Sequence, residues 1–449
     1  MRNPALWLDK TFALQEHTIA HYAWVVVGIA AVVQMVGAAI RMVFGVLVEP
    51  LVETFSWSPG SIGIAYALMS IIAALSSPPA GYLSNRFGAK RTMTAGTVLF
   101  FIGMMWTAQV QQIWELYAAY GIIFGIAQAT LLVPVVPAVA SWFRRHLGLG
   151  TGLMLGSWSL GPAIAVQVMA VLFEKIGWSQ SFMVTGIVGT ATLLFILLFF
   201  KDTPEQAGRV AYGARSSDKS LITSGNIFVE FQSEFQGFVY KTNAFWNLIN
   251  IHFLGCVGHA VILVGIIPLA MSKGLGPINA AGILTTISIV SIVTRFIAPV
   301  LSERYGSKIV MFFSFFGQGI GVFLLFTAGS TWEFYLFAVV WAIPYGGEGT
   351  VFPVINRQYY GHSPMGANYG WQLLGAGLGM ALGGLLPGLI FDITGGYAWA
   401  IGLSAAFSLA GAAAILFLEP TNRQLIPDWP EVESDHVTAG ASPVSNSGD

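Results

Sequence analysis

An arginine stands inside an apolar segment, SIVSIVTRFIAPVLSERYG, which covers residues 288–306. The guanidinium of this residue, Arg295, keeps its proton, so placing it in hydrocarbon costs free energy unless a partner compensates it. Its planar fork of N–H donors matches the two oxygens of a carboxylate. Arg295 is therefore our first candidate for binding an anionic ligand. The alternative is a structural arginine that pairs within the protein or extends to lipid headgroups.

One acidic residue, Glu348, lies well inside an apolar segment, in WAIPYGGEGTVFP (341–353). The protonation of a buried carboxyl depends on whether a cation lies beside it, which makes Glu348 a candidate proton acceptor. A permanent structural partner of an arginine, or an acid facing the cytoplasmic side, is the alternative. Glu348 and Arg295 each stand fifteen residues beyond the outer start of their segments, at Glu333 and Ala280. Both are therefore expected at the same depth, about 22 Å from the outer surface.

Further polar side chains complete the set of candidates. Arg41 is seventeen residues after Trp24, which places it nearer the outer side, where it attracts anions or lies at the membrane interface. His252 and His259 share one segment, and histidine titrates near neutral pH, so both are candidate proton sensors or hydrogen-bonded packing residues. Trp371 and Gln372 offer an aromatic wall and a neutral hydrogen bond. We predict that the substrate contacts are made by Arg295, Arg41, Gln128, His259, Asn368 and Tyr369, and that Glu348 couples a proton.

The composition shows why polar residues in these segments are informative. The 449 residues are 55% hydrophobic and 9% charged, whereas soluble domains carry about 25% charged residues. This indicates a polytopic membrane protein. The net charge of −1 gives no reason to expect a nucleic-acid partner. The single cysteine, Cys256, excludes an intrachain disulfide, and we expect no cysteine-based metal site.

Twelve segments are apolar and long enough to span a bilayer as helices. They cover residues 22–47, 61–83, 92–110, 115–140, 148–172, 181–200, 244–271, 280–302, 309–329, 333–356, 366–391 and 397–418. With the N-terminus inside, sixteen of the 20 Lys and Arg residues fall on the cytoplasmic side and two fall outside. We therefore predict an all-α multi-pass protein of the cytoplasmic (inner) membrane with both termini in the cytoplasm.

A polar segment divides the chain into two halves. Residues 1–200 and 244–418 are predicted to form an N-terminal and a C-terminal six-helix bundle, and residues 201–243 form a cytoplasmic linker. The tail, residues 419–449, is acidic and then rich in Ser, Gly and Pro, which predicts disorder.

An internal repeat supports this division. YLSNRFGAK (82–90) returns as VLSERYGSK (300–308), an offset of 218 residues, and each copy follows the second span of its half. With the same offset Arg295 falls opposite Ser77, so the two halves do not share this charge. Two parallel six-helix repeats are typical of one large class of alternating-access transporters.

The first copy also resembles a family signature. GYLSNRFGAKR (81–91) is similar to the loop motif of the major facilitator superfamily, G-x-L-x-D-R-x-G-R-[KR]. The motif's aspartate, which in the family helps to hold the cytoplasmic side shut, is Asn85 here, so we expect a weaker latch on this side. By the resemblance, the gating-loop residues are Gly81, Asn85, Arg86, Gly88, Glu303 and Arg304.

Other segments are similar to one branch of that superfamily, which contains monocarboxylate transporters and oxalate–formate antiporters. They are FGVLVEPLVETFSWSPG (44–60), WFRRHLGLGTGLMLGSWSLGP (142–162), DTPEQAG (202–208) and GANYGWQLLGAGLG (366–379). The resemblance implies that Arg295 is the arginine of the eighth span that meets the substrate carboxylate. The family's acid four residues earlier is Ser291 here. Oxalate transporters of this branch carry a lysine on the eleventh span, which this chain lacks, so doubly charged oxalate is a less expected substrate.

These observations predict a monomeric secondary transporter that moves a small organic anion, a monocarboxylate, together with a proton. Signatures of phosphate loops, dinucleotide sites and metal hydrolases are absent, so we expect no cofactor, no metal and no enzymatic activity. Two alternatives stay open. One is efflux of an amphipathic or hydrophobic compound, and the other is a non-transporting receptor on the same fold.

Overall fold

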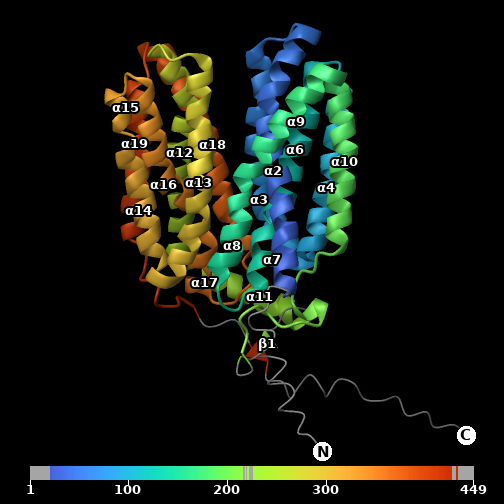
Figure 1. Cartoon of the computed structure of the whole chain (residues 1–449). Coiled ribbons are helices and arrows are strands. Elements are labelled where there is room, and N and C mark those ends of the chain that lie inside the picture. Colours follow the sequence, from blue (N-terminus) through green and yellow to red (C-terminus); the bar gives the residue numbers. More distant parts are fainter. Residues whose placement is uncertain (1–20, 216–217, 219, 222–225, 427–430, 433–449) are drawn as a thin grey trace, which may run out of the picture.

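The structure is a computed structural model that describes residues 21–215, 218, 220–221, 226–426 and 431–432. Its helices form two bundles that stand side by side (Figure 1). The N-terminal bundle contains α2 (Tyr22–Phe55), α3 (Pro59–Phe87), α4 (Ala89–Thr107), α5 (Ile113–Leu116), the π-helix η1 (Tyr117–Ile123), α6 (Phe124–Leu132), α7 (Val135–Ser141), α8 (Leu147–Gly156), the 3-10 turn η2 (Ser157–Ser159), α9 (Leu160–Ile176) and α10 (Trp178–Leu198).

The C-terminal bundle repeats this arrangement. It contains α12 (Asn243–Ser272), α13 (Pro277–Tyr305), α14 (Ser307–Gly321), α15 (Leu324–Thr327), α16 (Thr331–Glu348), α17 (Phe352–Tyr360), α18 (Gly366–Thr394) and α19 (Ala398–Leu416). The linker holds η3 (Glu205–Ala207), the two-residue strand β1 (Ser220–Leu221) and α11 (Asn226–Tyr240). β1 pairs in antiparallel fashion with β2 (Glu431–Val432), so this part of the predicted tail is paired, and the rest of residues 427–449 lies outside the described residues.

The predicted all-α membrane fold is confirmed. Within the described residues, ten helices or runs of helices are long and apolar enough to cross a membrane. α4 and the pair α16–α17 complete the twelve spans. Their lower hydropathy follows from Lys90 and Arg91 in the first turn of α4, and from Glu348 and Arg357 in α16–α17.

Four of the predicted spans are interrupted rather than continuous, two of them only by the 3-10 turn η2 (in 148–172) and by a turn at 322–323 (in 309–329). The segment predicted at 115–140 begins with the π-helix η1 and is broken again at Pro134, which has no N–H to donate to the helix ladder. The segment predicted at 333–356 stops at Glu348 and resumes at Phe352. Such interruptions are frequent at functional sites, because they re-aim side chains within a span.

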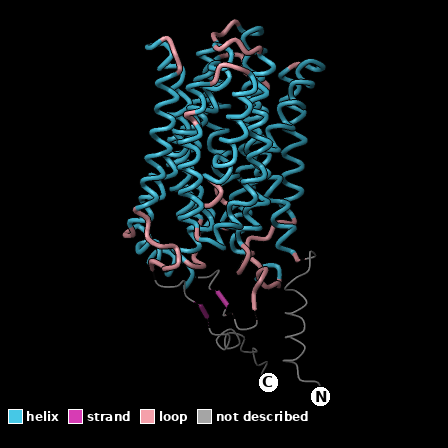
Figure 2. Tube along the Cα trace, turned by 60° about the vertical axis from the view of Figure 1, so that its left-hand side comes forward, coloured by secondary structure: helices cyan, strands magenta, loops and turns pink. Residues whose placement is uncertain are grey.

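Both described ends of the chain meet at one end of the bundles, which we name the linker end (Figure 2). The Tyr22 hydroxyl donates to the Phe199 carbonyl at 2.5 Å, and Lys308 Nζ donates to the Leu416 and Leu418 carbonyls at 2.9 and 2.5 Å. Lys90 Nζ makes the equivalent bond, 2.9 Å, to the carbonyl of Leu198. The repeated lysines therefore cap the last helix of each half.

The two halves touch through α3 with α18 and through α8 with α13. A Cβ at Gly81 would overlap the Gly366 carbonyl, and a Cβ at Gly148 would overlap the Pro299 carbonyl, so both approaches require glycine. Gly148 and Gly366 are 218 residues apart, which makes the two contacts copies of each other. All four residues lie in the linker-end parts of their helices. Toward the opposite end the bundles diverge (Figure 1).

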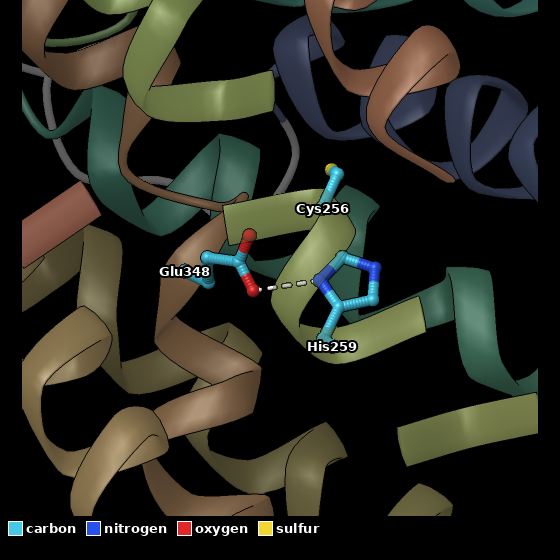
Figure 3. A group of neighbouring side chains, drawn as sticks. All are labelled: Cys256, His259 and Glu348. Atoms are coloured by element: carbon cyan, nitrogen blue, oxygen red, sulfur yellow. Dashed lines mark hydrogen bonds and ion pairs between the residues drawn. The ribbon is translucent and has the colours of Figure 1, made fainter. Parts of the chain in front are cut away.

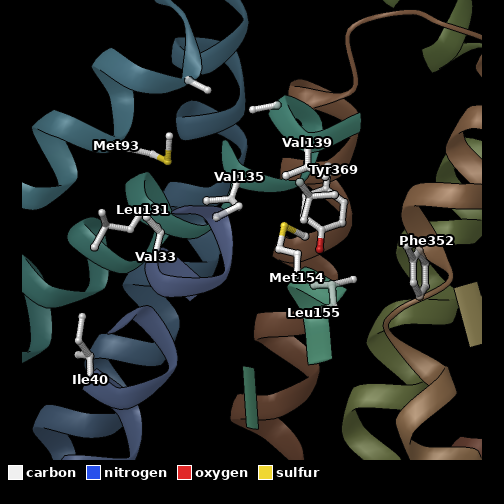
Figure 4. Close-up of a cluster of buried hydrophobic side chains, with 14 of the residues drawn as sticks. Val33, Ile40, Met93, Leu131, Val135, Val139, Met154, Leu155, Phe352 and Tyr369 are labelled. Atoms are coloured by element: carbon white, nitrogen blue, oxygen red, sulfur yellow. The ribbon is translucent and has the colours of Figure 1, made fainter. Parts of the chain in front are cut away.

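One buried apolar cluster contains residues of both halves. Figure 4 shows Val33, Leu131 and Val135 of the N-terminal half in the same cluster as Phe352 and Tyr369 of the C-terminal half. Because these apolar side chains are buried against one another, the two halves pack closely where the cluster crosses from one to the other.

Candidate functional site

A cavity of about 190 Å³ lies between the two halves, and polar side chains from both halves line it. The N-terminal half contributes Arg41, Ser77, Gln128 and Trp158. The C-terminal half contributes His252, Cys256, His259, Arg295, Tyr345, Glu348 and Met380. The structure thus brings together five of the residues proposed from the sequence, namely Arg41, Gln128, His259, Arg295 and Glu348.

Arg295 on α13 lies against an aromatic ring rather than an acid. Its guanidinium carbon is 4.9 Å from the centroid of the Tyr345 ring, which is an attractive arrangement for a cation. Its Nε is buried and has no hydrogen-bond partner among the described residues. Ser291, one turn earlier, is fully buried and donates its hydroxyl to the Ser288 carbonyl. A buried donor without a partner costs free energy, so Arg295 Nε is poised for an acceptor that the described residues do not supply.

Arg41 is held by Gln128 in the same cavity. Its Nε donates to Gln128 Oε1 at 3.0 Å and its Nη1 donates to the Met380 sulfur at 3.3 Å. Gln128 Nε2 in turn donates to the Gly37 carbonyl at 3.2 Å, which fixes the orientation of the amide. α2 continues to Phe55, so Arg41 lies just beyond the middle of the helix, toward the end opposite the linker, and its place relative to the outer surface stays a prediction.

Glu348 pairs with a histidine. His259 Nδ1 and Glu348 Oε2 are 2.8 Å apart, and α12 and α16 bring them together (Figure 3). Glu348 is 2% exposed, and its Oε1 has no partner among the described residues. The arginine partner that the sequence suggested for Glu348 is thus replaced by His259. His252 lies two turns away, stacked on Phe352 with 4.0 Å between ring centroids.

Three side chains of this cavity have the chemistry of metal ligands. One ligand atom each from Cys256, His259 and Glu348 lies within 4.8 Å of the others (Figure 3). This corrects the argument that a single cysteine excludes a cysteine-based metal site, since histidine and glutamate on neighbouring turns and helices complete the set. Arg41 and Arg295, however, give the cavity two guanidinium groups against one carboxylate. This balance favours an anion over a divalent cation.

Asn368 and Tyr369 do not line this cavity, contrary to their prediction as substrate contacts. Asn368 is fully buried at the linker end, where its Oδ1 accepts from Gln236 Nε2 of α11 at 2.5 Å. Tyr369 is 6% exposed and belongs to the apolar cluster (Figure 4). Both lie in the first turn of α18, whereas α18 contributes to the cavity from Leu373 to Met380, one to three turns further along.

The gating-loop residues lie at the N-termini of helices from the other half. Asn85 Oδ1 lies against Gly366, the first residue of α18, and Asn85 Nδ2 has no partner among the described residues. The Glu303 carboxylate faces the backbone N–H groups of Leu147 and Gly148, which begin α8. Helix N-termini attract negative charge, so Glu303 stabilises this contact between halves electrostatically and the neutral Asn85 does so less.

The other gating residues shape the loops themselves. Arg86 is exposed with its guanidinium carbon 5.4 Å from the Phe87 ring, and Arg304 has the same exposure and distance to the Tyr305 ring. The turns that follow have φ of 93° at Gly88 and 92° at Gly306, a region that favours glycine. The repeat therefore preserves the loop conformation in both halves.

Sequence reasoning missed two residues of consequence. Tyr345 precedes Glu348 by three positions, and this spacing on a helix could have placed it on the cavity face. Arg357 of α17 donates to the carbonyls of Phe143 and Ala140 in the other half, at 3.2 and 2.7 Å. No local pattern predicts Arg357, because its acceptors lie more than two hundred residues away.

Comparisons with known proteins agree with this architecture. The family model of the Major Facilitator Superfamily matches residues 29–276 and 248–445. The MFS-type transporter YhjX of Escherichia coli is 25% identical over 323 residues, 71% of this chain and 76% of that protein. The oxalate:formate antiporter of Oxalobacter formigenes is 24% identical over 381 residues, 80% of this chain and 84% of that protein. Human monocarboxylate transporter 2 is 21% identical over 437 residues, covering 95% and 91%.

Solved structures show the same fold. The proton:xylose symporter XylE superposes with a TM-score of 0.74 at 15% identity, covering 91% of this chain and 98% of that chain. FucP, in its outward conformation, gives a TM-score of 0.66 at 14% identity, covering 87% and 98%. With the family model matching nearly the whole chain, this protein belongs to the Major Facilitator Superfamily of transporters.

Proposed function

We propose that this protein is a secondary active transporter that moves a small organic anion, a monocarboxylate, across the cytoplasmic membrane by alternating access. The observation that carries the proposal is the buried Nε of Arg295, which has no partner among the described residues and lies in a cavity between the halves. A carboxylate that accepts from this nitrogen would satisfy it. At about 4 Å and an effective dielectric of 20, the attraction is about 4 kcal/mol before desolvation.

The names of the relatives support a carboxylate. The names of the oxalate:formate antiporter and of monocarboxylate transporter 2 both say that these relatives carry carboxylates. The size of the cavity favours the same class. Sites for drug-sized ligands occupy about 300–1,000 Å³, and the cavity here has a volume of about 190 Å³. Efflux of a large amphipathic compound is therefore the weaker candidate.

The distribution of basic residues supports an orientation with the linker end in the cytoplasm, since sixteen of the 20 Lys and Arg residues fall on that side. The halves meet at the linker end and diverge toward the other (Figure 1). In the proposed orientation this is the outward-facing conformation, in which an external anion enters the cavity. If the halves then close at the opposite end and separate at the linker end, the anion is released into the cytoplasm.

The pair of His259 and Glu348 supports coupling to a proton. The two side chains are 2.8 Å apart in the cavity that holds Arg295, so an anion bound there changes the electrostatic environment of both. In this scheme the pair takes up a proton as the anion binds and releases it when the anion leaves. The imported charge is thereby reduced by the proton that accompanies it.

Uptake into proteoliposomes tests both parts of the proposal. Arg295→Ala should lower carboxylate uptake about 100-fold, because it removes a buried charged contact, and Arg295→Lys should lose most of it because a bidentate fork is lost.

Glu348→Gln should keep carboxylate exchange but lose the response to an imposed pH gradient. Arg423→Ala, an exposed arginine after α19, is the matched control. Uptake at the wild-type rate by Arg295→Ala would exclude the proposed binding role.

A further inference from the structure

The linker runs along the loop between α7 and α8. Tyr212 donates its N–H to the Trp142 carbonyl at 2.7 Å, and the Arg144 N–H donates to the Tyr212 carbonyl at 2.9 Å. The bridge between Phe143 and Tyr212 is parallel. We name residues 211–215 together with Asp218 the strap, because the backbone of Tyr212 is bound to loop 142–146.

Aromatic rings fix the strap to the start of the first span. The centroid of the Tyr212 ring lies 5.5 Å from that of His21, 5.4 Å from that of Trp24 and 5.5 Å from that of Phe143. The first two ring pairs are edge-on and the third is tilted. Such arrangements are favourable between aromatic groups. The strap is thus positioned against both α2 and loop 142–146.

An ion pair closes the strap at its other end. Arg145 Nη1 and Nη2 donate to the two carboxylate oxygens of Asp218 at 2.8 and 3.0 Å, and Arg145 Nη1 also donates to the Gly213 carbonyl at 2.5 Å. The bidentate geometry makes this pair directional. The Arg145 guanidinium lowers the pKa of Asp218 to about 2, so the carboxylate is charged at neutral pH.

The opposite side of the same loop is held by the C-terminal half. Arg357 donates to the Ala140 and Phe143 carbonyls, and the Glu303 carboxylate faces the N–H groups of Leu147 and Gly148. Between these two contacts His146 adopts φ 62°, an unfavourable conformation for a residue other than glycine. Surrounding contacts must therefore maintain the shape of the loop.

We propose that Asp218 is a positioning residue of the transport cycle. By binding Arg145 it holds loop 142–146 in the shape that Arg357 and Glu303 contact, and so favours the conformation that is closed at the linker end. The linker then does more than connect the halves, since it sets how readily this end opens. The inference rests on the proposed alternating access, but its test requires no substrate.

The chain contains its own reporter. Cys256 is the single cysteine, and it lines the cavity between the halves. This residue is 4% exposed, so a membrane-impermeant methanethiosulfonate reaches its thiol only through whichever end of the protein is open, and labelling is slow from either side. Labelling rates measured from each side of oriented vesicles therefore report the fraction of each conformation without any engineered cysteine.

In Asp218→Asn and in Arg145→Gln, we expect labelling of Cys256 from the linker end to rise about two- to fivefold and labelling from the other end to fall. A change of this size is expected from losing the small stabilisation that a partly exposed ion pair contributes. Asp218→Glu should restore the wild-type rates, and Arg357→Gln, which breaks the contact between halves directly, is the positive control. Wild-type rates in Asp218→Asn alongside faster labelling in Arg357→Gln would overturn the proposal. Equal acceleration from both ends would also overturn it, because that indicates general loosening.

If the protein does not transport carboxylates but still alternates, these labelling shifts remain and the Arg295 uptake test fails. If carboxylate uptake depends on Arg295 but labelling is unaffected by Asp218→Asn, the strap proposal alone is wrong. The two results are therefore separable.

Discussion

α3 and α13, each with the loop that follows it, are copies of one repeated unit, and they differ in charge at two matching positions. In α3, Ser77 lines the cavity and donates its hydroxyl to the Ala73 carbonyl of its own helix. In α13 the equivalent residue is Arg295, whose guanidinium faces Tyr345. In the loops, Asn85 matches Glu303, so the C-terminal copy carries the charge both times.

What the copies share is the support of the fold. Gly88 and Gly306 make the same turn, and Lys90 and Lys308 bind the last helix of their halves in the same way. The shared positions thus maintain the two bundles, whereas the two differences in charge lie at the cavity (Ser77 and Arg295) and at contacts between the halves (Asn85 and Glu303). Comparing the copies identifies functional residues more directly than inspecting either half.

Exchanging the divergent residues in the cavity is the strongest way to test this comparison. We expect Arg295→Ser combined with Ser77→Arg to lose uptake about 100-fold, like Arg295→Ser alone, because the charge would leave Tyr345 and the His259–Glu348 pair. Ser77→Arg alone serves as the control for a blocked cavity. Carboxylate uptake into proteoliposomes is the measurement. Recovery in the double variant would mean that the net charge of the cavity matters and its position does not.

The sequence was sufficient to predict the elements and to bring Arg295 and Glu348 to the same cavity. The length of the apolar segments located the twelve spans. Counting residues placed Arg295 and Glu348 at the same level, and both line the same cavity in the structure. Length also misled, because the start of α18 is buried in the apolar cluster. Asn368 and Tyr369 were thus wrongly placed in the cavity.

Contacts between the halves were beyond sequence reasoning. Arg357 meets carbonyls whose positions depend on how α7 ends and how α17 resumes after the break at Glu348. His259 meets Glu348 because α12 and α16 cross at that level, and no spacing within either helix indicates it. A periodicity describes one helix at a time, so a site assembled from several helices requires the tertiary structure.

The loops provide the second test of the comparison, with an intermediate effect. Glu303→Gln removes the charge at the start of α8, and we expect labelling of Cys256 from the linker end to become about threefold faster. Glu174→Gln, an exposed acid at the other end of the protein, is the matched control. Unchanged labelling in Glu303→Gln would show that the Glu303 charge does not contribute to holding the linker end closed.

The smallest expected effect comes from the N-terminal loop. Asn85→Asp places a charge at the start of α18 and replaces an amide nitrogen that has no partner in the described part of the chain, so we expect labelling from the linker end to become about twofold slower. Combining Asn85→Asp with Glu303→Gln should bring the labelling rate back toward wild type if a charge at the start of α18 stabilises the closed end as well as one at the start of α8. If the double variant labels as fast as Glu303→Gln alone, closure depends on the α8 contact and not on the α18 contact. The neutral Asn85 would then mark a position where the N-terminal copy lost its role in the latch.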